Sequence, residues 1–198
     1  MTRIICLIIL LGFSAGTKAQ FQAVIEDVLP ENAFPVVVFE TDQGIVEVEL
    51  NRMRAPVTVN NFLSYAVEGA YDNTIFHRVI RDFVVQGGGF KDGWEEVPAR
   101  LPVMNESGNG LPNDAWTIAM ARFSDPHSAT NQFFFNVADN SDTLNPSERQ
   151  WGYTVFGNVI TGQEVLEKIA AVQTGYNAEL DYQDVPITPV RLLKVSVQ

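Results

Sequence analysis

The sequence predicts a mainly β domain, an antiparallel barrel or sandwich with two helices over its ends. About seven or eight segments are rich in β-forming residues, and only two carry a helical apolar stripe. The strand-like segments follow one another in tandem, whereas a doubly wound parallel sheet needs strands that alternate with helices. The length of 198 residues fits one domain with a short extension.

The first predicted strands form a hairpin. Residues 35–40 are a β-branched run, and residues 42–44, Asp-Gln-Gly, supply the turn. Residues 45–50 then alternate between apolar and acidic side chains, which is typical of a strand with one face in the core and one in water. The remaining segments that we expect to be strands are 76–85, 116–121, 132–137, 153–159 and 189–197.

Two helices are predicted between the strands. The first begins at Pro56, where a missing N–H costs nothing, and ends at Gly69. The second begins at Thr161, with Glu164 three residues later as a capping box. Their apolar stripes consist of Val59, Phe62, Leu63, Ala66 and Val67, and of Val165, Leu166, Ile169 and Val172. Residues 91–115, rich in Gly, Asn and Pro, are expected to form a long functional loop.

The N-terminus has the pattern of a secretory signal peptide. Arg3 precedes the apolar run Ile4–Phe13, and small and polar residues follow up to Ala19. We therefore expect cleavage after Ala19, a lead-in over residues 20–34, and a folded domain over residues 35–198 of an exported, periplasmic protein. The alternative is an uncleaved membrane anchor, for which the run is short.

Charge and composition exclude several classes of protein. There are 13 basic and 24 acidic residues, a net charge of −11, which argues against nucleic acid or an anionic membrane as partner. The single cysteine cannot form an intrachain disulfide. The two histidines and the one cysteine show no metal-ligand spacing, so no metal or cofactor is expected. Residues 139–145 resemble a calcium loop but lack its glycine and bidentate acid.

Two further patterns concern catalysis. Asp125, His127 and Ser128 include the residue types of a hydrolase triad, but no nucleophile elbow surrounds the serine. In residues 76–80, Arg78 lies among aliphatic and aromatic neighbours. It is either paired with an acid in a phenylalanine-rich core, or it borders an apolar pocket with Gln86 and Gln132. Such a pocket would bind a proline ring and hydrogen-bond the adjacent peptide group.

Several long motifs decide between these interpretations, because they resemble the cyclophilin-type peptidyl-prolyl cis-trans isomerases. The motifs lie in one order over residues 35–197. They are Phe76-His77-Arg78-Val79-Ile80 with Phe83, Gln86-Gly87-Gly88-Gly89-Phe90, Ile118-Ala119-Met120-Ala121, Asn131-Gln132-Phe133-Phe134-Phe135-Asn136 and Val155-Phe156-Gly157. The runs 120–122 and 136–140 are similar to those of the exported A-type isomerases of the bacterial periplasm.

The resemblance implies an eight-stranded antiparallel closed barrel capped by two helices, and it implies the site. The residues that match the family's catalytic positions are Arg78, Phe83 and Gln86. Those that match its substrate-binding positions are Val84, Ala121, Arg122, Phe123, Gln132, Phe134, Trp151, Tyr153 and Phe156. Val84 stands in place of a methionine and Tyr153 of a histidine. Arg122 stands in place of an asparagine and Phe123 of a small residue, so the groove for residues before the proline is expected to be tighter than usual.

The function that follows is isomerisation of X–Pro bonds in exported proteins, assisting their folding without a cofactor. Two alternatives stay open from the sequence: a holdase that captures proline-containing segments without turnover, and a purely structural barrel. The expected partners are proline-containing polypeptides, with a monomer as the resting state. For cyclosporin-like cyclic peptides, Trp151 favours binding, whereas Arg122 and Phe123 argue against it.

Overall fold

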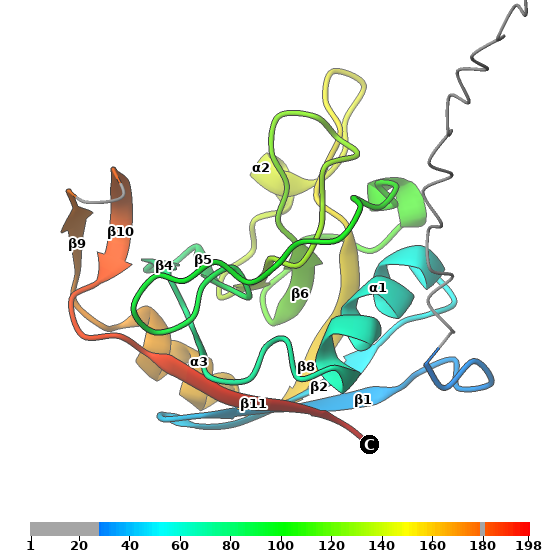
Figure 1. Cartoon of the computed structure of the whole chain (residues 1–198). Helices are drawn as coiled ribbons and strands as arrows, with labels where there is room; N and C mark the ends of the chain where they lie inside the picture. The colour runs from blue at the N-terminus through cyan, green and yellow to red at the C-terminus, as the bar shows by residue number, and fades with distance from the viewer. Residues whose placement is uncertain (1–27, 179–180) are drawn as a thin grey trace, which may run out of the picture.

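The computed structural model describes residues 28–178 and 181–198, and its main feature is one curled antiparallel sheet of nine strands (Figure 1). The strands, in chain order, are β1 Val36–Thr41, β2 Gly44–Leu50, β3 Thr74–Ile75, β4 Arg78–Ile80, β5 Val84–Gly87, β6 Thr117–Met120, β7 Phe133–Asn136, β8 Val155–Thr161 and β11 Arg191–Val197. Neighbours in the sheet follow the order β3-β11-β1-β2-β8-β6-β7-β5-β4. The mainly β class predicted from the sequence is confirmed.

The closed eight-stranded barrel of the prediction is not confirmed, because the sheet is an open, curled half-barrel. Its two end strands, β3 and β4, are consecutive in the chain and are separated only by Phe76 and His77. β3 pairs with β11, and β4 pairs with β5. The chain therefore connects the two ends of the sheet through Phe76 and His77. The predicted continuous strand 76–85 is instead divided by a turn at residues 81–83 into β4 and β5, which pair with each other.

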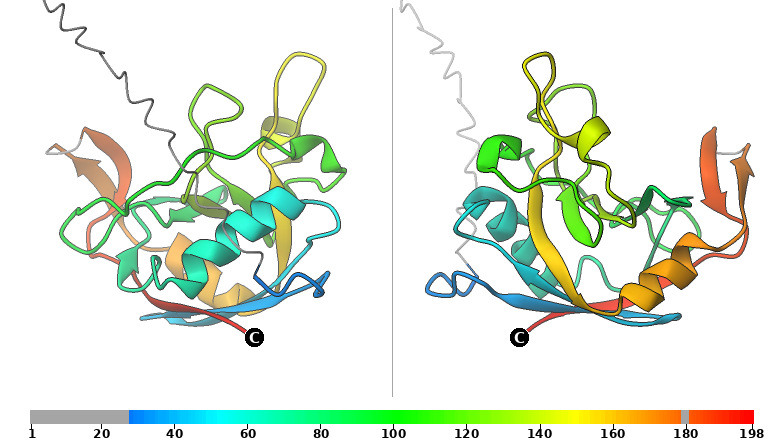
Figure 2. Two further views of the ribbon diagram at one scale, coloured as in Figure 1. Left: turned by 45° about the vertical axis from the view of Figure 1, so that its right-hand side comes forward. Right: turned by 180° about the vertical axis from the view of Figure 1, so that it is seen from behind.

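The core lies inside the curl, and a cluster of phenylalanine rings forms its centre. Phe133 packs edge-on against Phe39 and Phe62 at ring-centre distances of 5.5 and 5.6 Å. Helix α1, Pro56–Val67, places Phe62 in this cluster, and helix α3, Gln163–Ala170, contacts β2, β4 and β5 on another side (Figure 2). Edge-on aromatic pairs contribute about 0.5–1.5 kcal/mol beyond their burial.

The start of α3 differs from the prediction of a capping box. The N-cap is Gly162 instead of Thr161, and no side chain caps this end of the helix. Gly162 has a φ of +89°, and a Cβ added to it would lie 2.3 Å from the carbonyl oxygen of Ile45. The close approach of the β1–β2 hairpin therefore selects a glycine here, and sequence spacing alone does not report that contact.

Four short elements were not expected from the sequence. They are the one-turn helix α2, Ser141–Leu144, the 3₁₀ turn η1, Ser107–Asn109, and the hairpin strands β9, Thr174–Asn177, and β10, Tyr182–Pro186. α2 makes a third helix where two were predicted, over the segment that resembles a calcium loop. The β9–β10 hairpin stands out from the sheet beside β4 (Figures 1 and 2).

The predicted signal peptide, residues 1–19, and most of the lead-in 20–34 lie outside the described residues. From residue 28 onward the lead-in is attached to the domain, since the Arg52 side chain donates to the carbonyl oxygens of Val28 and Asn32. In residues 28–178 and 181–198, no helix has the length and apolarity needed to cross a bilayer.

Candidate active site

The candidate site is built on one row of residues that crosses four strands. Arg78 of β4 is directly opposite Gln86 of β5, Gln86 is opposite Phe134 of β7, and Phe134 is opposite Ala119 of β6. Residues directly opposite in antiparallel strands project from the same face of a sheet. The row therefore brings the predicted catalytic arginine, a glutamine and an aromatic ring together on the face that points away from the phenylalanine core.

A small apolar cavity of about 200 Å³ opens on this row. Its lining residues are Arg78, Phe83, Val84, Gln86, Ala121, Arg122, Phe134, Leu144 and Tyr153. The Phe134 and Tyr153 rings meet edge-on at 5.6 Å, and Phe134, Val84 and Leu144 belong to a small apolar cluster separate from the main core. A compact apolar ring fits such a cavity.

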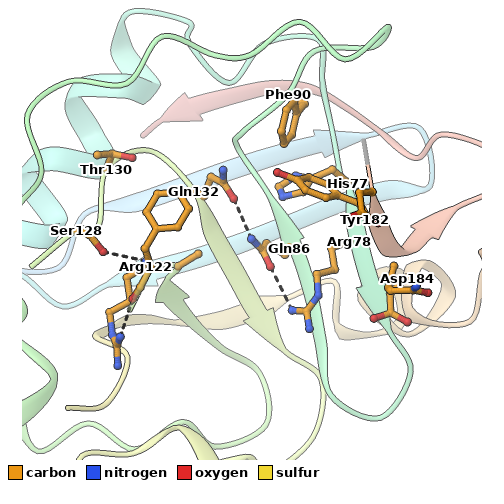
Figure 3. Close-up of a pocket in the computed structure, with 14 residues that line it drawn as sticks. His77, Arg78, Gln86, Phe90, Arg122, Ser128, Thr130, Gln132, Tyr182 and Asp184 are labelled. Carbon is orange, nitrogen blue, oxygen red and sulfur yellow. Dashed lines mark hydrogen bonds between the residues drawn. The ribbon is translucent and has the colours of Figure 1, made fainter. Parts of the chain in front are cut away.

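A hydrogen-bonded chain of three polar side chains borders the cavity. Gln86 Nε2 donates to Gln132 Oε1 at 2.9 Å, and Arg78 Nη1 donates to Gln86 Oε1 at 3.4 Å (Figure 3). Gly89 leaves room for this chain, since a Cβ there would lie 2.7 Å from Gln132 Nε2. The ion pairs among the described residues do not include Arg78, and Arg78 lines both cavities of the site.

A larger cavity of about 360 Å³ adjoins the small one, and Arg78, Gln86, Ala121 and Arg122 line both. Most of the residues that line the larger cavity carry polar groups. Beyond the shared residues its walls are His77, Phe90, Phe123, Ser128, Thr130, Gln132, Asp181, Tyr182, Gln183 and Asp184 (Figure 3). The last four come from the end of the β9–β10 hairpin, which sequence reasoning did not connect with the site.

His77 is a buried wall of the larger cavity. Its ring packs edge-on against Phe90 at 5.0 Å, and its Nδ1 has no hydrogen-bond partner. Burial, together with the nearby Arg78 charge, lowers the pKa of His77 to about 4, against the opposing effect of hydrogen bonding with Gln132. The imidazole is therefore neutral near pH 7.

Arg122 joins two loops and does not present a free charge to the groove. Its guanidinium donates to the carbonyl oxygens of Phe123, Trp151 and Gly152, at 2.8, 2.7 and 3.2 Å. It also lies over the Tyr153 ring, 4.5 Å from the ring centre. The sequence comparison placed Arg122 in the substrate strip, and these contacts give it the additional task of positioning the Tyr153 wall.

Two of the predicted substrate-binding residues do not line either cavity. Phe156 has an exposed fraction of 0% and packs on Phe62 at 5.3 Å in the main core. In β8, Val155 is opposite Ala119 of the site face, so the next residue points to the core. Placing Phe156 in the proline pocket is therefore wrong for this structure.

Trp151 is the second such residue. It is 51% exposed, packs edge-on against His127 at 5.2 Å, and lies outside both sets of lining residues. Phe123, by contrast, lines the larger cavity and is 76% exposed. Trp151 is connected to the site through its backbone carbonyl oxygen, which accepts a hydrogen bond from Arg122.

Leu144 and His77 are site residues that sequence reasoning did not select. Leu144 reaches the small cavity from α2, a single turn whose signal in the sequence is weak. His77 follows the alternation rule to the face opposite Arg78, but the interruption between β3 and β4 returns it to the same cavity. For His77, the only signal in the sequence was its position as the second residue of the motif 76–80.

The triad-like residues form a turn and not a catalytic unit. Ser128 Oγ donates to the backbone oxygen of Asp125 and accepts from the Phe123 N–H, and His127 Nδ1 accepts from the Asn105 N–H. These atoms are thus engaged in loop geometry. Among residues 28–178 and 181–198, no three His, Cys, Asp or Glu side chains gather as a metal site.

The fold and the site together fit an enzyme that binds a polypeptide segment and needs no nucleophilic side chain, and the comparisons with known proteins agree. Residues 36–197 match the family "Cyclophilin type peptidyl-prolyl cis-trans isomerase/CLD". The chain belongs to this family and is a peptidyl-prolyl cis-trans isomerase.

Similar proteins include several bacterial isomerases. The chain is 50% identical to peptidyl-prolyl cis-trans isomerase cyp18 of Streptomyces antibioticus, over 78% of this chain and 93% of that protein. It is 47% identical to isomerase B of Escherichia coli strain K12, over 82% and 99%, and 48% identical to isomerase A of Dickeya dadantii, over 78% and 80%. A Cryptosporidium parvum cyclophilin, solved in the presence of the dipeptide Ala-Pro, superposes with a TM-score of 0.67, at 25% identity, over 82% of this chain and 98% of that one.

Proposed function

We propose that this isomerase accelerates X–Pro isomerisation in exported polypeptides and so assists their folding, with the proline ring held in the small cavity. The observation that carries the proposal is the position of Arg78, whose unpaired guanidinium lies between an apolar cavity and two hydrogen-bonded glutamines. An enzyme for this reaction needs those two features side by side, because it must hold an apolar ring and stabilise a polar transition state.

The imide barrier is about 18–20 kcal/mol because resonance gives the C–N bond double-bond character. In the twisted transition state this resonance is lost, and the prolyl nitrogen becomes pyramidal and accepts a hydrogen bond. Arg78 is always charged and presents several donors in a fixed fork. A donor that binds the twisted state more tightly than either planar state lowers the barrier selectively.

The apolar walls contribute by removing water from the imide. Phe83, Phe134 and Tyr153 surround the space beside Arg78. Planar imides are stabilised by water on their carbonyl oxygen, so a dry cavity reduces the stabilisation of the starting state relative to the twisted state. Gln86 and Gln132 offer amide groups that hold the peptide backbone at the cavity edge.

The test compares Arg78→Ala and Arg78→Lys with the unchanged protein on an Ala-Pro peptide. We expect Arg78→Ala to lower kcat/KM by about 10²–10³-fold, the usual effect of removing one transition-state donor. Arg78→Lys should recover only part of the rate because an ammonium lacks the fork. Near-normal catalysis by Arg78→Ala would contradict the proposed role.

A holdase would give a different result in the same series. If the groove served capture alone, Arg78→Ala would suppress aggregation of an unfolded proline-containing client as well as the unchanged protein does, whatever its turnover. For the proposed enzyme, the refolding rate of a client limited by proline isomerisation should fall with kcat/KM in the same variants.

The proposal of an exported substrate depends on the pattern in residues 1–19 and on the resemblance to exported isomerases. Expression in a Gram-negative host, with fractionation and intact-mass measurement, tests it. We expect periplasmic protein with its N-terminus at Gln20, and cytoplasmic protein that keeps residues 1–19 would contradict it. Binding of cyclosporin-like cyclic peptides and the monomeric state stay predictions, which inhibition assays and sedimentation would measure.

A further inference from the structure

The larger cavity has walls of opposite charge. The wall that it shares with the small cavity carries the cation Arg78, together with Arg122, whose guanidinium is bound to three backbone carbonyl groups. The wall formed by the β9–β10 hairpin carries Asp181 and Asp184, and Figure 3 labels Asp184. The two cavities share four lining residues, so a polypeptide that places its proline ring in the small cavity reaches the larger one when it extends in that direction. In that direction the hairpin is the wall that its side chains meet.

Of the two carboxylates, Asp184 is the better placed to contact a substrate residue. It is half-buried, and it makes no hydrogen bond or ion pair with any described residue. The register of β9 and β10 shifts between Tyr182 and Val185, and Asp184 has a φ of +60° at this irregularity. Asp181 nearby accepts a 2.7 Å hydrogen bond from the Tyr176 hydroxyl. Both carboxylates thus line the cavity from fixed backbone positions.

A second and independent feature of the same cavity is a buried side chain with a nitrogen atom that lacks a hydrogen-bond partner. His77 is buried in the wall of the same cavity, and its Nδ1 has no hydrogen-bond partner. A buried polar atom without a partner is rare and costly in a folded protein. In the appropriate tautomer of the neutral ring this nitrogen is an acceptor. The carboxylates offer acceptors to a ligand that has only donors, in a cavity whose wall also contains this unpartnered nitrogen.

We infer that the larger cavity is a subsite for a cationic side chain, lysine or arginine, on a substrate residue near the proline. Lys and Arg carry three and five donors and no acceptor, which matches these groups. Alternate side chains of an extended peptide project from the same side of the backbone, so a residue two positions from the proline points toward the same surface as the ring. The inference rests on the proposed placement of proline in the small cavity.

The experiment uses six peptides with one X–Pro bond, carrying Lys, Gln or Glu two positions before the proline or two positions after it. Exchange NMR without a protease measures kcat/KM for each peptide at low ionic strength. On one side of the proline we expect the Lys peptide to exceed the Glu peptide by about three- to tenfold, as partly exposed charge pairs allow, with Gln between them. The ratio should shrink with added salt.

The variant Asp181→Asn/Asp184→Asn should reduce this Lys-to-Glu ratio to below about twofold, since charge attraction is lost while side-chain size is kept. Asparagine also tolerates positive φ, so the hairpin backbone is retained. Asp82→Asn is the matched control: Asp82 has a φ of +56° and lies on a turn outside both cavities, and its substitution removes the same charge. It should keep the ratio of the unchanged protein.

The ¹⁵N shift of His77 Nδ1 is a second readout. It should move with the Lys peptide and stay in place with a norleucine peptide of the same length. Equal kcat/KM for Lys, Gln and Glu on both sides of the proline would overturn the subsite while leaving the isomerase intact. A ratio that survives in the double variant, or falls equally in Asp82→Asn, would also overturn it. Absence of turnover on all six peptides would overturn both proposals.

Discussion

The two cavities share four residues and differ in almost everything else. The small cavity is closed by aromatic and aliphatic side chains from β5, β7 and α2, and it belongs to an apolar cluster of its own. The larger cavity is closed by polar side chains from loops and from the β9–β10 hairpin. Arg78 and Gln86 stand between them.

This difference indicates that catalysis and the recognition of neighbouring substrate residues depend on different parts of the same sheet face. The small cavity is rigid because it is formed by paired strands, and its residues fit the part of the substrate that every X–Pro bond shares. The larger cavity includes side chains of a hairpin that lies outside the main sheet and contacts β4, the strand of Arg78. Three predictions test this separation, in order of expected effect.

The largest effect is expected from Phe156→Ala. Phe156 is fully buried in the main core, so its truncation should lower the free energy of unfolding by about 3–5 kcal/mol. The molecules that remain folded should keep kcat/KM within about twofold, because the residue lines neither cavity. Urea unfolding and an activity measurement corrected for the folded fraction check both parts.

Phe134→Ala is the matched counterpart on the site face. Phe134 is buried too, but it forms a wall of the small cavity. Its loss should lower kcat/KM by about ten- to a hundredfold, the equivalent of losing much of an apolar side chain's burial for the proline ring. If Phe156→Ala impaired catalysis as strongly as Phe134→Ala does, the assignment of the two faces of the sheet would be wrong.

The second effect concerns pH and the wall of the larger cavity. Burial lowers the pKa of His77 from 6.5 to about 4, so between these values the unfolded chain binds a proton that the folded protein excludes. The contribution of the neutral His77 ring to the free energy of unfolding is fully present above pH 6.5. It is lost as the pH falls toward 4, which lowers the free energy of unfolding by about 3 kcal/mol. Urea unfolding at pH 7, 5.5 and 4.5 measures it.

His77→Gln is the control for that slope, because glutamine does not titrate. The difference in free energy of unfolding between the two proteins should change with pH across this window. Identical slopes in the two proteins would show that His77 has an ordinary pKa and is not sealed in the cavity wall.

The smallest effect is expected from Arg122→Lys, which removes the element that separates the cavities. Lysine cannot reach three carbonyl groups or stack flat on the Tyr153 ring as the guanidinium does. We expect a loss of about 1 kcal/mol in stability, or a Tm lower by about 2–4 °C, and a KM raised by about twofold. An unchanged Tm by calorimetry would mean that the loops are held together by other contacts.

Much of the fold followed from local patterns. The alternation in residues 45–50 predicted a strand with buried Val46, Val48 and Leu50, and these residues are buried. The helix from Pro56 was predicted at its observed first residue. The motifs with Arg78, Gln86 and Gln132 also predicted residues that the structure brings to one place.

Other features required contacts that no local pattern encodes. The capping box at Thr161 failed because the backbone of Ile45, far away in sequence, leaves no room for a side chain at Gly162. Phe156 was placed in the proline pocket by the family resemblance, and the register of β8 against β6 shows that Val155 faces the site while Phe156 lies in the core.

The sequence by itself determined the strand and helix periodicities, the family and the chemistry available at Arg78, because these depend on residue type and spacing along the chain. The tertiary structure decided that the sheet stays open between β3 and β4, that His77 turns into the same cavity as Arg78, and that the hairpin supplies Asp184. These outcomes depend on how segments far apart in the chain pack against one another, and that packing is set by long-range contacts that periodicity does not record.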